Sequence, residues 1–595
     1  MRRPLLAGLA LALPGLMLKP APQARAQAYD RLAPKAASPA APPQAPTLPT
    51  PPPPALPRAT GVIIPTLKAL VFLPTPEALR ASGLPAGTAG VQCAGLPLLA
   101  QPGFSRTMRA YLGKSLRLAD LNTIARTTSA FYRAHGHPFV YVTIPPQNIS
   151  TGVVQVIVTE YRLGTMTISG NRWFSTGLLQ RESGLKPGEA LVLSHVQAGL
   201  DRLNANPFRT VNAVFSPGQT RGTTDVTLHA NDRLPVHVYG SFDTVGAPAL
   251  GRGELAIGGT WGNVAGIGHI VSYQFTHSIN DRYSGHAISW LAPLPWHDRI
   301  QVFGSYTREI PTIQDSSAYL HDTGHSAQAS MRYIHDLPSI TFSPDLHLSE
   351  DIQLGFDFKT TNNTLEFGGL SVFKNRAEVD QFPIIYNATL DDPYGKTIFQ
   401  NQLVLSPGGV SGANHKLNFQ TLVPGSSDRY VYDTLSLSRT TDLPAGFSWA
   451  MQAVGQLANT NLMYNDQLGL GGLSTARGYF SDSALGSEGV SITNELYGPS
   501  FSIMQFLMPD RAVQDTEQLG VFYDYGHTAQ VHAMPNANNE ADLASIGLDL
   551  QSSVGRYVNL VFNMGWRLRT LAISREESGY GNKGAYGNMA LTIGF

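Results

Sequence analysis

The chain is poor in cysteine, in charge and in long hydrophobic runs. Cys93 is the one cysteine in 595 residues, which excludes an internal disulfide and predicts a free structural thiol. Charged residues make up 14% of the chain, against about 25% in ordinary soluble domains. Beyond the N-terminus, no run approaches the ~18 uninterrupted apolar residues of a membrane-spanning helix. With a mean hydropathy of −0.08, these absences favour a transmembrane β-barrel, whose strands alternate apolar and polar residues.

The sequence also lacks the signatures of nucleic-acid binding and of catalysis. Its net charge is zero and it has no basic tract, so we expect no nucleic-acid partner. No G-x-S-x-G, H-E-x-x-H or phosphate-binding loop occurs. His135 and His137 bracket Gly136 at a predicted helix end, which is poor geometry for a metal. We therefore expect a protein that is not an enzyme, with no catalytic residue, no metal and no cofactor.

The N-terminus has the features of a secretory signal over residues 1–26. Arg2 and Arg3 are followed by an apolar stretch and by the cleavage pattern Ala24-Arg25-Ala26. Residues 27–65 are rich in proline and predict an extended linker that builds no core. The mature chain is thus expected to begin near Gln27, outside the cytoplasm.

Two α/β units are predicted next, at residues 66–161 and 162–232. Each has the order β-α-α-β-β, which makes them a tandem repeat. Residues 83–105 of the first unit follow neither helical nor strand spacing. In the second unit, Ser194 and Gln197 form a capping-box pattern, which predicts that a helix starts there.

Residues 233–595 change to segments of about ten alternating residues, the length of a tilted strand that crosses a bilayer. Leu255, Ile257 and Trp261 exemplify one apolar face. The predicted strands number sixteen, an even number as in bacterial barrels; a soluble β-sandwich or solenoid is the alternative. Their starts lie near residues 235, 251, 268, 284, 298, 323, 346, 380, 395, 430, 446, 488, 517, 541, 556 and 585.

The last predicted strand alternates apolar residues up to the aromatic C-terminus, Phe595. Outer-membrane barrels commonly end in this way, and the barrel assembly machinery recognises such a final strand. We therefore interpret Phe595 as a barrel-assembly signal.

A lone cation and a lone carboxylate stand out within this sheet. Arg477 lies in a glycine-rich run between the eleventh and twelfth predicted strands, and Asp524 lies on the thirteenth. Both have glycine and aromatic neighbours, which predicts a contact in the barrel lumen if the loop folds inward. The alternative is a solvated arginine at a hairpin tip and an ordinary lumenal charge.

In order along the chain, these features resemble the TpsB transporters of two-partner secretion, the hemolysin secretion/activation family. The two units resemble POTRA domains, and the first carries the P-x-Q-x-I turn. In the barrel, an R-G-Y loop motif precedes an F-x-D-x-G strand motif. The matching residues are Pro145, Gln147, Ile149 and Gly152, then Arg477, Gly478 and Tyr479, then Phe522, Asp524 and Gly526.

The resemblance implies α+β periplasmic POTRA repeats followed by an antiparallel barrel of about sixteen strands in the bacterial outer membrane. It implies a pore that recognises and translocates a large secreted protein partner. The P-x-Q-x-I turn is then a candidate for substrate capture. Outer-membrane lipid and, during biogenesis, the barrel assembly machinery are the other implied partners. An assembly factor for other barrels, a passive porin and a surface adhesin are the rival functions.

The chain departs from the family pattern at two places. Prolines between residues 27 and 48 disfavour a helix interior by ~3 kcal/mol each, so a plug helix is not expected beyond Gln27–Leu32. Ala476 stands where valine or isoleucine commonly precedes the loop arginine.

Overall fold

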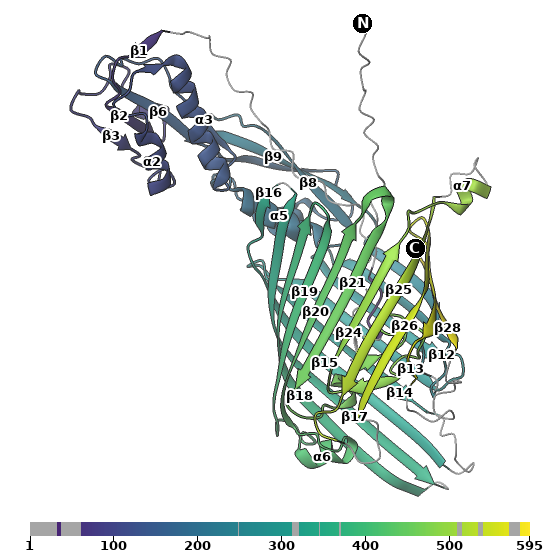
Figure 1. Cartoon of the computed structure of the whole chain (residues 1–595). Coiled ribbons are helices and arrows are strands. Elements are labelled where there is room, and N and C mark those ends of the chain that lie inside the picture. Colours follow the sequence, from purple (N-terminus) through teal and green to yellow (C-terminus); the bar gives the residue numbers. More distant parts are fainter. Residues whose placement is uncertain are drawn as a thin grey trace.

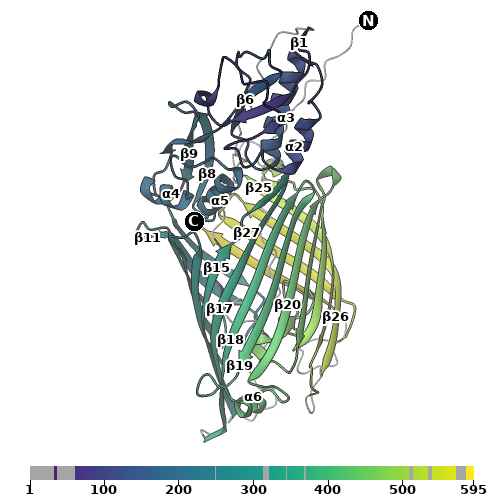
Figure 2. The ribbon, with the colours of Figure 1, turned by 90° about the vertical axis from the view of Figure 1, so that its left-hand side faces the viewer.

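The computed structural model describes residues 32–36, 61–247, 249–311, 320–343, 345–367, 370–507, 514–533, 539–570 and 584–595. The predicted signal, at residues 1–26, and most of the predicted linker lie outside these ranges. Two α/β units stack one above the other at one end of a barrel, which we call the near end (Figures 1 and 2).

The first unit has a four-stranded sheet in the order β3-β2-β6-β5, with β2 and β6 parallel. Aromatic and aliphatic side chains from the sheet and two helices form its core, in which Phe72 and Phe104 are buried. Its elements are β1 (Val62–Ile64), β2 (Ala69–Leu73), η1 (Pro76–Ala78), β3 (Gly90–Gln92), α2 (Pro102–Arg109), β4 (Leu116–Arg117), α3 (Leu118–Ala134), β5 (Val140–Thr143) and β6 (Val153–Glu160). β3 and α2 occupy the stretch that the sequence pattern left unassigned.

The second unit has a three-stranded sheet in the order β7-β9-β8. Its elements are β7 (Arg162–Ser169), α4 (Thr176–Ser183), α5 (Leu193–Asn204), β8 (Arg209–Pro217) and β9 (Thr223–Asp232). The capping box predicted at Ser194 is wrong: α5 begins at Leu193, and its cap residue Val192 makes no side-chain cap hydrogen bond. The amide of Leu193 instead donates to the carbonyl of Gly136 in the first unit, at 3.0 Å. A contact between the units thus satisfies the first amide of the helix.

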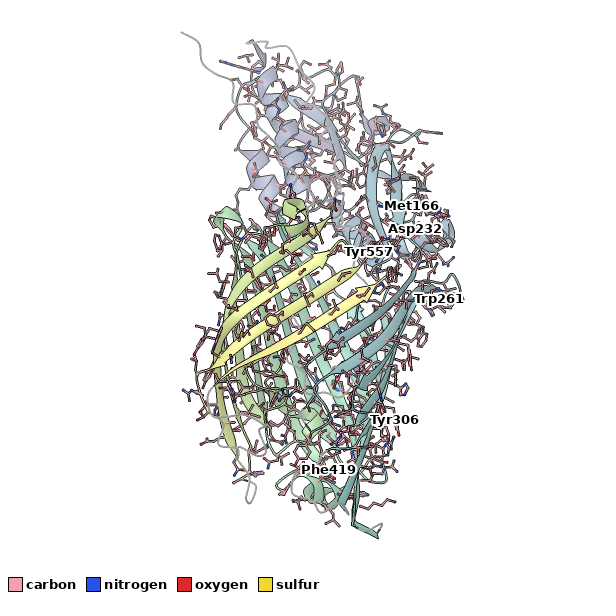
Figure 3. All side chains as sticks on the ribbon, turned by 90° about the vertical axis from the view of Figure 1, so that its right-hand side faces the viewer. Met166, Asp232, Trp261, Tyr306, Phe419 and Tyr557 are labelled. Carbon is pink, nitrogen blue, oxygen red and sulfur yellow. The ribbon has the colours of Figure 1, made fainter. Side chains whose placement is uncertain are left out.

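Hydrogen bonds also join the second unit to the barrel. At the end of β9, the Asp232 carboxylate accepts from the backbone amides of residues 172, 173 and 174. The carbonyl of Trp173 in that loop accepts from Asn263 Nδ2 at 3.0 Å, and Asn206 Nδ2 donates to the carbonyl of Gly262 at 2.6 Å. Figure 3 shows Asp232 at this junction, above Trp261. The last strand of the unit therefore fixes a loop that in turn contacts the end of barrel strand β11.

The barrel is a closed antiparallel sheet in which sixteen described strands complete the circuit. The first strand pairs with the last, with Tyr239 opposite Gly594. The strands are β10 (Val236–Asp243), β11 (Glu254–Val264), β12 (His269–Ser278), β13 (Tyr283–Pro293), β14 (Arg299–Glu309), β15 (Leu320–Asp336), β17 (Leu346–Phe367), β18 (Leu370–Asp392), β19 (Gly395–Pro407), β20 (Arg429–Asp442), β21 (Ser448–Ala458), β24 (Glu488–Tyr497), β25 (Asp515–Ala529), β26 (Glu540–Val554), β27 (Val558–Arg567) and β28 (Ala585–Gly594). A further short strand, β16 (Ile340–Ser343), pairs with β17.

The predicted fold class and barrel are confirmed, and so is the alternation of the strands. Ile257 is 68% exposed on the outer face, while the neighbouring Ala256 is 7% exposed. The largest error in the predicted strand starts is at β18, which begins at residue 370 rather than near 380. β17 and β18 have 22 and 23 residues, whereas about 9–11 residues cross a bilayer. Their surplus length extends the barrel wall at the end remote from the two units, which we call the far end.

Two short helices that were not predicted lie between barrel strands. α6 (Lys416–Leu422) lies at the far end, and α7 (Ile503–Leu507) lies at the near end (Figure 1). Among the described residues, no helix combines the length and the apolar character that a membrane span requires.

Cys93 is a free thiol at the edge of the first unit's core. Burial raises its pKa to about 11. At pH 8 its thiolate fraction is then about 200-fold below that of an ordinary cysteine with a pKa near 8.5. We expect alkylation by iodoacetamide to be slower by about that factor, to accelerate with pH up to about 11, and to become normal in denaturant. A native-state rate equal to that of free cysteine would contradict the burial.

Candidate functional site

The connection between β21 and β24 folds back into the barrel. It carries the one-turn helix η3 (Tyr464–Asp466) and a hairpin of β22 (Leu468–Leu470) and β23 (Ala484–Gly486). This hairpin lies against β25: a Cβ on Gly526 would be 2.7 Å from Leu470, and one on Gly486 would be 2.6 Å from the Cβ of Thr528. Glycine is therefore required where the hairpin meets the wall. We call residues 459–487 the lumenal loop.

Arg477 lies at the tip of the lumenal loop and is 2% exposed. Its backbone N and its Nε each donate to Asp524 Oδ2 at 2.9 Å, and Nη2 donates to Asp524 Oδ1 at 2.7 Å. The Asp524 carboxylate is thus bound by the planar fork of the guanidinium and by the main chain of the same residue. The structure brings the predicted pair together in the lumen.

Two further carboxylates contact this guanidinium. Nη1 donates to Glu495 on β24 and lies 3.5 Å from Asp549 Oδ2 on β26. The ring of Phe522 lies beneath the guanidinium, with 3.8 Å between its centroid and Cζ. Three neighbouring strands therefore hold one cation, and removing a partner of such a buried pair costs about 3–5 kcal/mol because a charge is left without compensation.

The residues beside Arg477 bring the loop backbone onto the wall. Gly478 has φ = +99°, and a Cβ there would lie 3.0 Å from the carbonyl oxygen of Gly565 on β27. Tyr479 is fully buried and donates to the carbonyl of Ala544 at 3.1 Å. Ala476 is 1% exposed in a small apolar cluster around Tyr479. Alanine in place of the usual valine or isoleucine at position 476 thus keeps an apolar side chain in a buried position.

The P-x-Q-x-I turn in the first unit packs inward. Gln147 Oε1 accepts from the backbone N of Gln155 on β6 at 2.8 Å, and Gln147 Nε2 donates to its carbonyl at 2.7 Å. Ile149 packs against the core. Gly152 has φ = +80°, and a Cβ there would lie 2.6 Å from the Thr66 carbonyl oxygen. Gln147 Nε2 also lies 3.3 Å from the carbonyl of Pro145. The side-chain amide of Gln147 thus makes the two hydrogen bonds to β6 that a neighbouring strand would make.

Residues 32–36 and the C-terminal residue both lie near the closure of the barrel. The backbone of Phe595 exchanges hydrogen bonds with Val238 on β10, at 2.9 and 3.2 Å. Residues 32–36 lie inside the lumen: Leu32 is 1% exposed against Tyr283, and Lys35 Nζ donates to Thr592 Oγ1 on β28 at 2.9 Å. Most of the short helix allowed at Gln27–Leu32 lies outside the described residues, but the segment that follows it occupies the pore.

Sequence reasoning did not find Glu495 and Asp549, nor a second buried pair between Lys359 and Asp466. All four are single polar residues on or beside alternating strands, where inward-facing charges are common. Only the barrel register shows which of them face one another. Among the described residues, no group of three or more histidine, cysteine or acidic side chains is placed to hold a metal ion.

The three carboxylates around Arg477 are expected to contribute unequally, because Asp524 accepts three hydrogen bonds, Glu495 one and Asp549 one long contact. Urea unfolding in detergent should rank Asp524→Asn as the most destabilising at about 3 kcal/mol, Glu495→Gln as intermediate, and Asp549→Asn as the mildest at about 1 kcal/mol. Equal effects of all three substitutions would contradict this assignment.

The close approach at the loop tip predicts a second difference. Gly478→Ala must move the loop away from Gly565 and strain a positive φ, so we expect a lower midpoint of unfolding in detergent. Gly455→Ala on β21 is the matched control, because no atom lies within 4 Å of its added Cβ. If both substitutions shift the midpoint equally, the contact at Gly478 is not what holds the tip.

Comparison with known proteins agrees with this geometry. The haemolysin secretion/activation family ShlB/FhaC/HecB matches residues 222–551, and the POTRA domain of ShlB type matches residues 88–160. The heme/hemopexin transporter protein HuxB of Haemophilus influenzae strain 86-028NP is 24% identical over 464 residues, which cover 76% of this chain and 78% of the relative. The outer membrane transporter CdiB of Dickeya dadantii strain 3937 is 23% identical over 413 residues, covering 67% and 70%.

Solved structures share the fold. CdiB from Escherichia coli aligns with a TM-score of 0.73 at 18% identity, covering 91% of this chain and 92% of the other. CdiB from Acinetobacter baumannii aligns with a TM-score of 0.63 at 17% identity, covering 89% and 90%. The family match covers more than half of the chain and spans most of the barrel. The chain therefore belongs to the haemolysin secretion/activation family, and it is an outer-membrane transporter of two-partner secretion with periplasmic POTRA domains.

Proposed function

We propose that the transporter captures a large secreted partner on its POTRA units and threads it through the lumen as an extended chain. The observation that carries this proposal is the content of the pore. The lumenal loop and residues 32–36 both lie inside a sixteen-strand barrel, held by non-covalent contacts. A barrel of about this size leaves an aqueous channel once its interior is free, which suits an extended chain better than a folded domain. A hemolysin or adhesin of the two-partner type is the cargo class we expect.

Capture is proposed at the edge of β8. Among the described residues, β8 pairs with β9 and with no other strand, and Val214 on β8 is 56% exposed. An extended segment of the partner adds there as a further strand. Four to six such hydrogen bonds at about 0.5–1.5 kcal/mol each, less the cost of ordering the segment, give weak and transient binding. Weak capture suits a transporter that must release its cargo.

The other candidate residues have supporting parts in this proposal. Pro145, Gln147, Ile149 and Gly152 shape the first unit rather than contact cargo. The apolar outer faces of the strands contact lipid. Phe595 is the signal for the barrel assembly machinery, while β28 is still unpaired. No catalytic step is proposed, and folding of the partner at the cell surface draws the chain outward.

Export of the secreted partner, produced in the same cells as the transporter, tests the capture step. Deleting residues 66–231 should abolish export while the barrel still inserts and conducts ions in planar bilayers. Intact export by that deletion variant would rule out capture by the POTRA units.

A point substitution locates the capture edge. Val214→Glu should slow export by about 2–5-fold, the value of one cross-strand pair. Val62→Glu is the matched control, because Val62 is equally exposed, at 54%, on β1 of the other unit. Equal slowing by both substitutions would place capture elsewhere.

A further inference from the structure

The lumenal loop is fastened at a second point, near its beginning. Asp466 ends η3, and its Oδ1 lies 2.6 Å from Lys359 Nζ on β17. Their side chains are 1% and 3% exposed. An ion pair this deeply buried must be compensated by its surroundings, and it lies on a different part of the wall from Arg477.

The surroundings of this pair are polar and belong to the barrel. Asp466 Oδ1 also accepts from Tyr432 on β20 at 3.2 Å and from Gln381 Nε2 on β18 at 3.4 Å. Gln381 extends the network to Asp357, which pairs with Arg332 on β15 at 2.6 Å. The pair is therefore part of a network on β15, β17, β18 and β20, whereas Arg477 is held by β24, β25 and β26. Lys359 and Asp524 lie six strands apart in the circuit of sixteen.

Residues 459–466 also pack against two other connections at the far mouth of the barrel. Leu462 and Met463 share an apolar core with Phe419 and Val423 from the connection between β19 and β20. Asn461 donates to the carbonyl of Pro424 at 2.8 Å and to that of His532 at 2.7 Å. Figure 3 shows Phe419 at the end of the barrel opposite Asp232. Three connections thus meet over the exit, and we call this assembly the mouth closure.

The two fastenings differ in how strongly they are held. The Arg477 side chain has three carboxylate partners and an aromatic ring beneath it. Its backbone amide also donates to the Asp524 carboxylate. Asp466 has one cation, and its buried Oδ2 has no hydrogen-bond partner among the described residues. A buried carboxylate oxygen without a partner is costly. Breaking the contacts of Asp466 therefore costs less free energy than breaking those of Arg477.

We propose that the Lys359–Asp466 pair is the releasable fastening of the mouth closure, and that the Arg477 end of the loop stays on the wall while cargo leaves. Parting this pair frees residues 459–466 to move aside with the connection that carries α6. The hairpin of β22 and β23 remains along β25. The inference rests on the proposed function only in that the cargo is taken to be a secreted protein. Opening of the mouth is a property of the pore itself and can be measured without cargo.

Disulfide locks test the proposal on the full chain with Cys93→Ser. Asn465 of the moving segment donates through Nδ2 to Thr361 Oγ1 on wall strand β17 at 3.0 Å, so cysteines at these two positions can form a disulfide between the loop and the wall. Oxidised Thr361→Cys/Asn465→Cys should lose pore openings in planar bilayers and lose export, and reduction should restore both. Oxidised Leu470→Cys/Ala484→Cys, which joins the paired strands β22 and β23 of the hairpin, should retain both. Normal openings with the mouth locked, or loss of openings only with the hairpin locked, would overturn the proposal.

A charge-neutral pair of variants gives a readout without cross-linking. Lys359→Met/Asp466→Asn removes both charges and should raise the frequency of pore openings about tenfold, the effect of roughly 1.4 kcal/mol. Lys396→Met/Asp391→Asn is the matched control, because it removes an ion pair that is half exposed. Equal opening frequencies in both variants would contradict the proposal. Bilayer recordings need no partner protein. If the openings change as expected but no partner is exported, the proposed cargo is wrong, whereas the proposed release of the mouth closure stands.

Discussion

Pairing of β10 with β28 is the constraint on which the rest of the structure depends. A closed sheet leaves no edge in the hydrocarbon, where an unsatisfied backbone group costs several kcal/mol. Closure also creates an interior that lipid cannot reach and in which charge is tolerated. Arg477 lies there beside three carboxylates, a composition that the outer face of the same strands would not accept. The fastening of the lumenal loop is therefore a consequence of ring closure.

The barrel could be predicted from the sequence because the period of a strand is local. Alternation at Leu255 and Ile257 appears in a few neighbouring residues, so strand starts were found without knowledge of their partners. β18 began earlier than predicted because its first residues extend beyond the bilayer, where alternation no longer has to match lipid. α2 and α6 were missed because both are short, at 8 and 7 residues, too short for a clear helical period.

The candidate site was predictable only in part, since its contacts join residues far apart in the sequence. Arg477 and Asp524 were conspicuous because each is a lone charge among glycine and aromatic residues. Glu495 and Lys359 look like any inward-facing charge, and only the register shows that each meets the loop. Gln147 was conspicuous through its motif, but the motif did not show that its side-chain amide serves as a strand partner for β6.

The position of residues 32–36 has a consequence for what else the channel can hold. These residues are synthesised before any barrel strand, yet Lys35 contacts Thr592 on the last one. An early segment of the chain is thus enclosed by a sheet whose last strand is made after it. A closed ring has no lateral opening, so this piece can leave only along the barrel axis. Since 24 residues separate it from residue 61, its travel is bounded by a tether of about 80 Å at full extension. Cargo in the channel therefore has to share the lumen with this tethered segment or displace it along the axis.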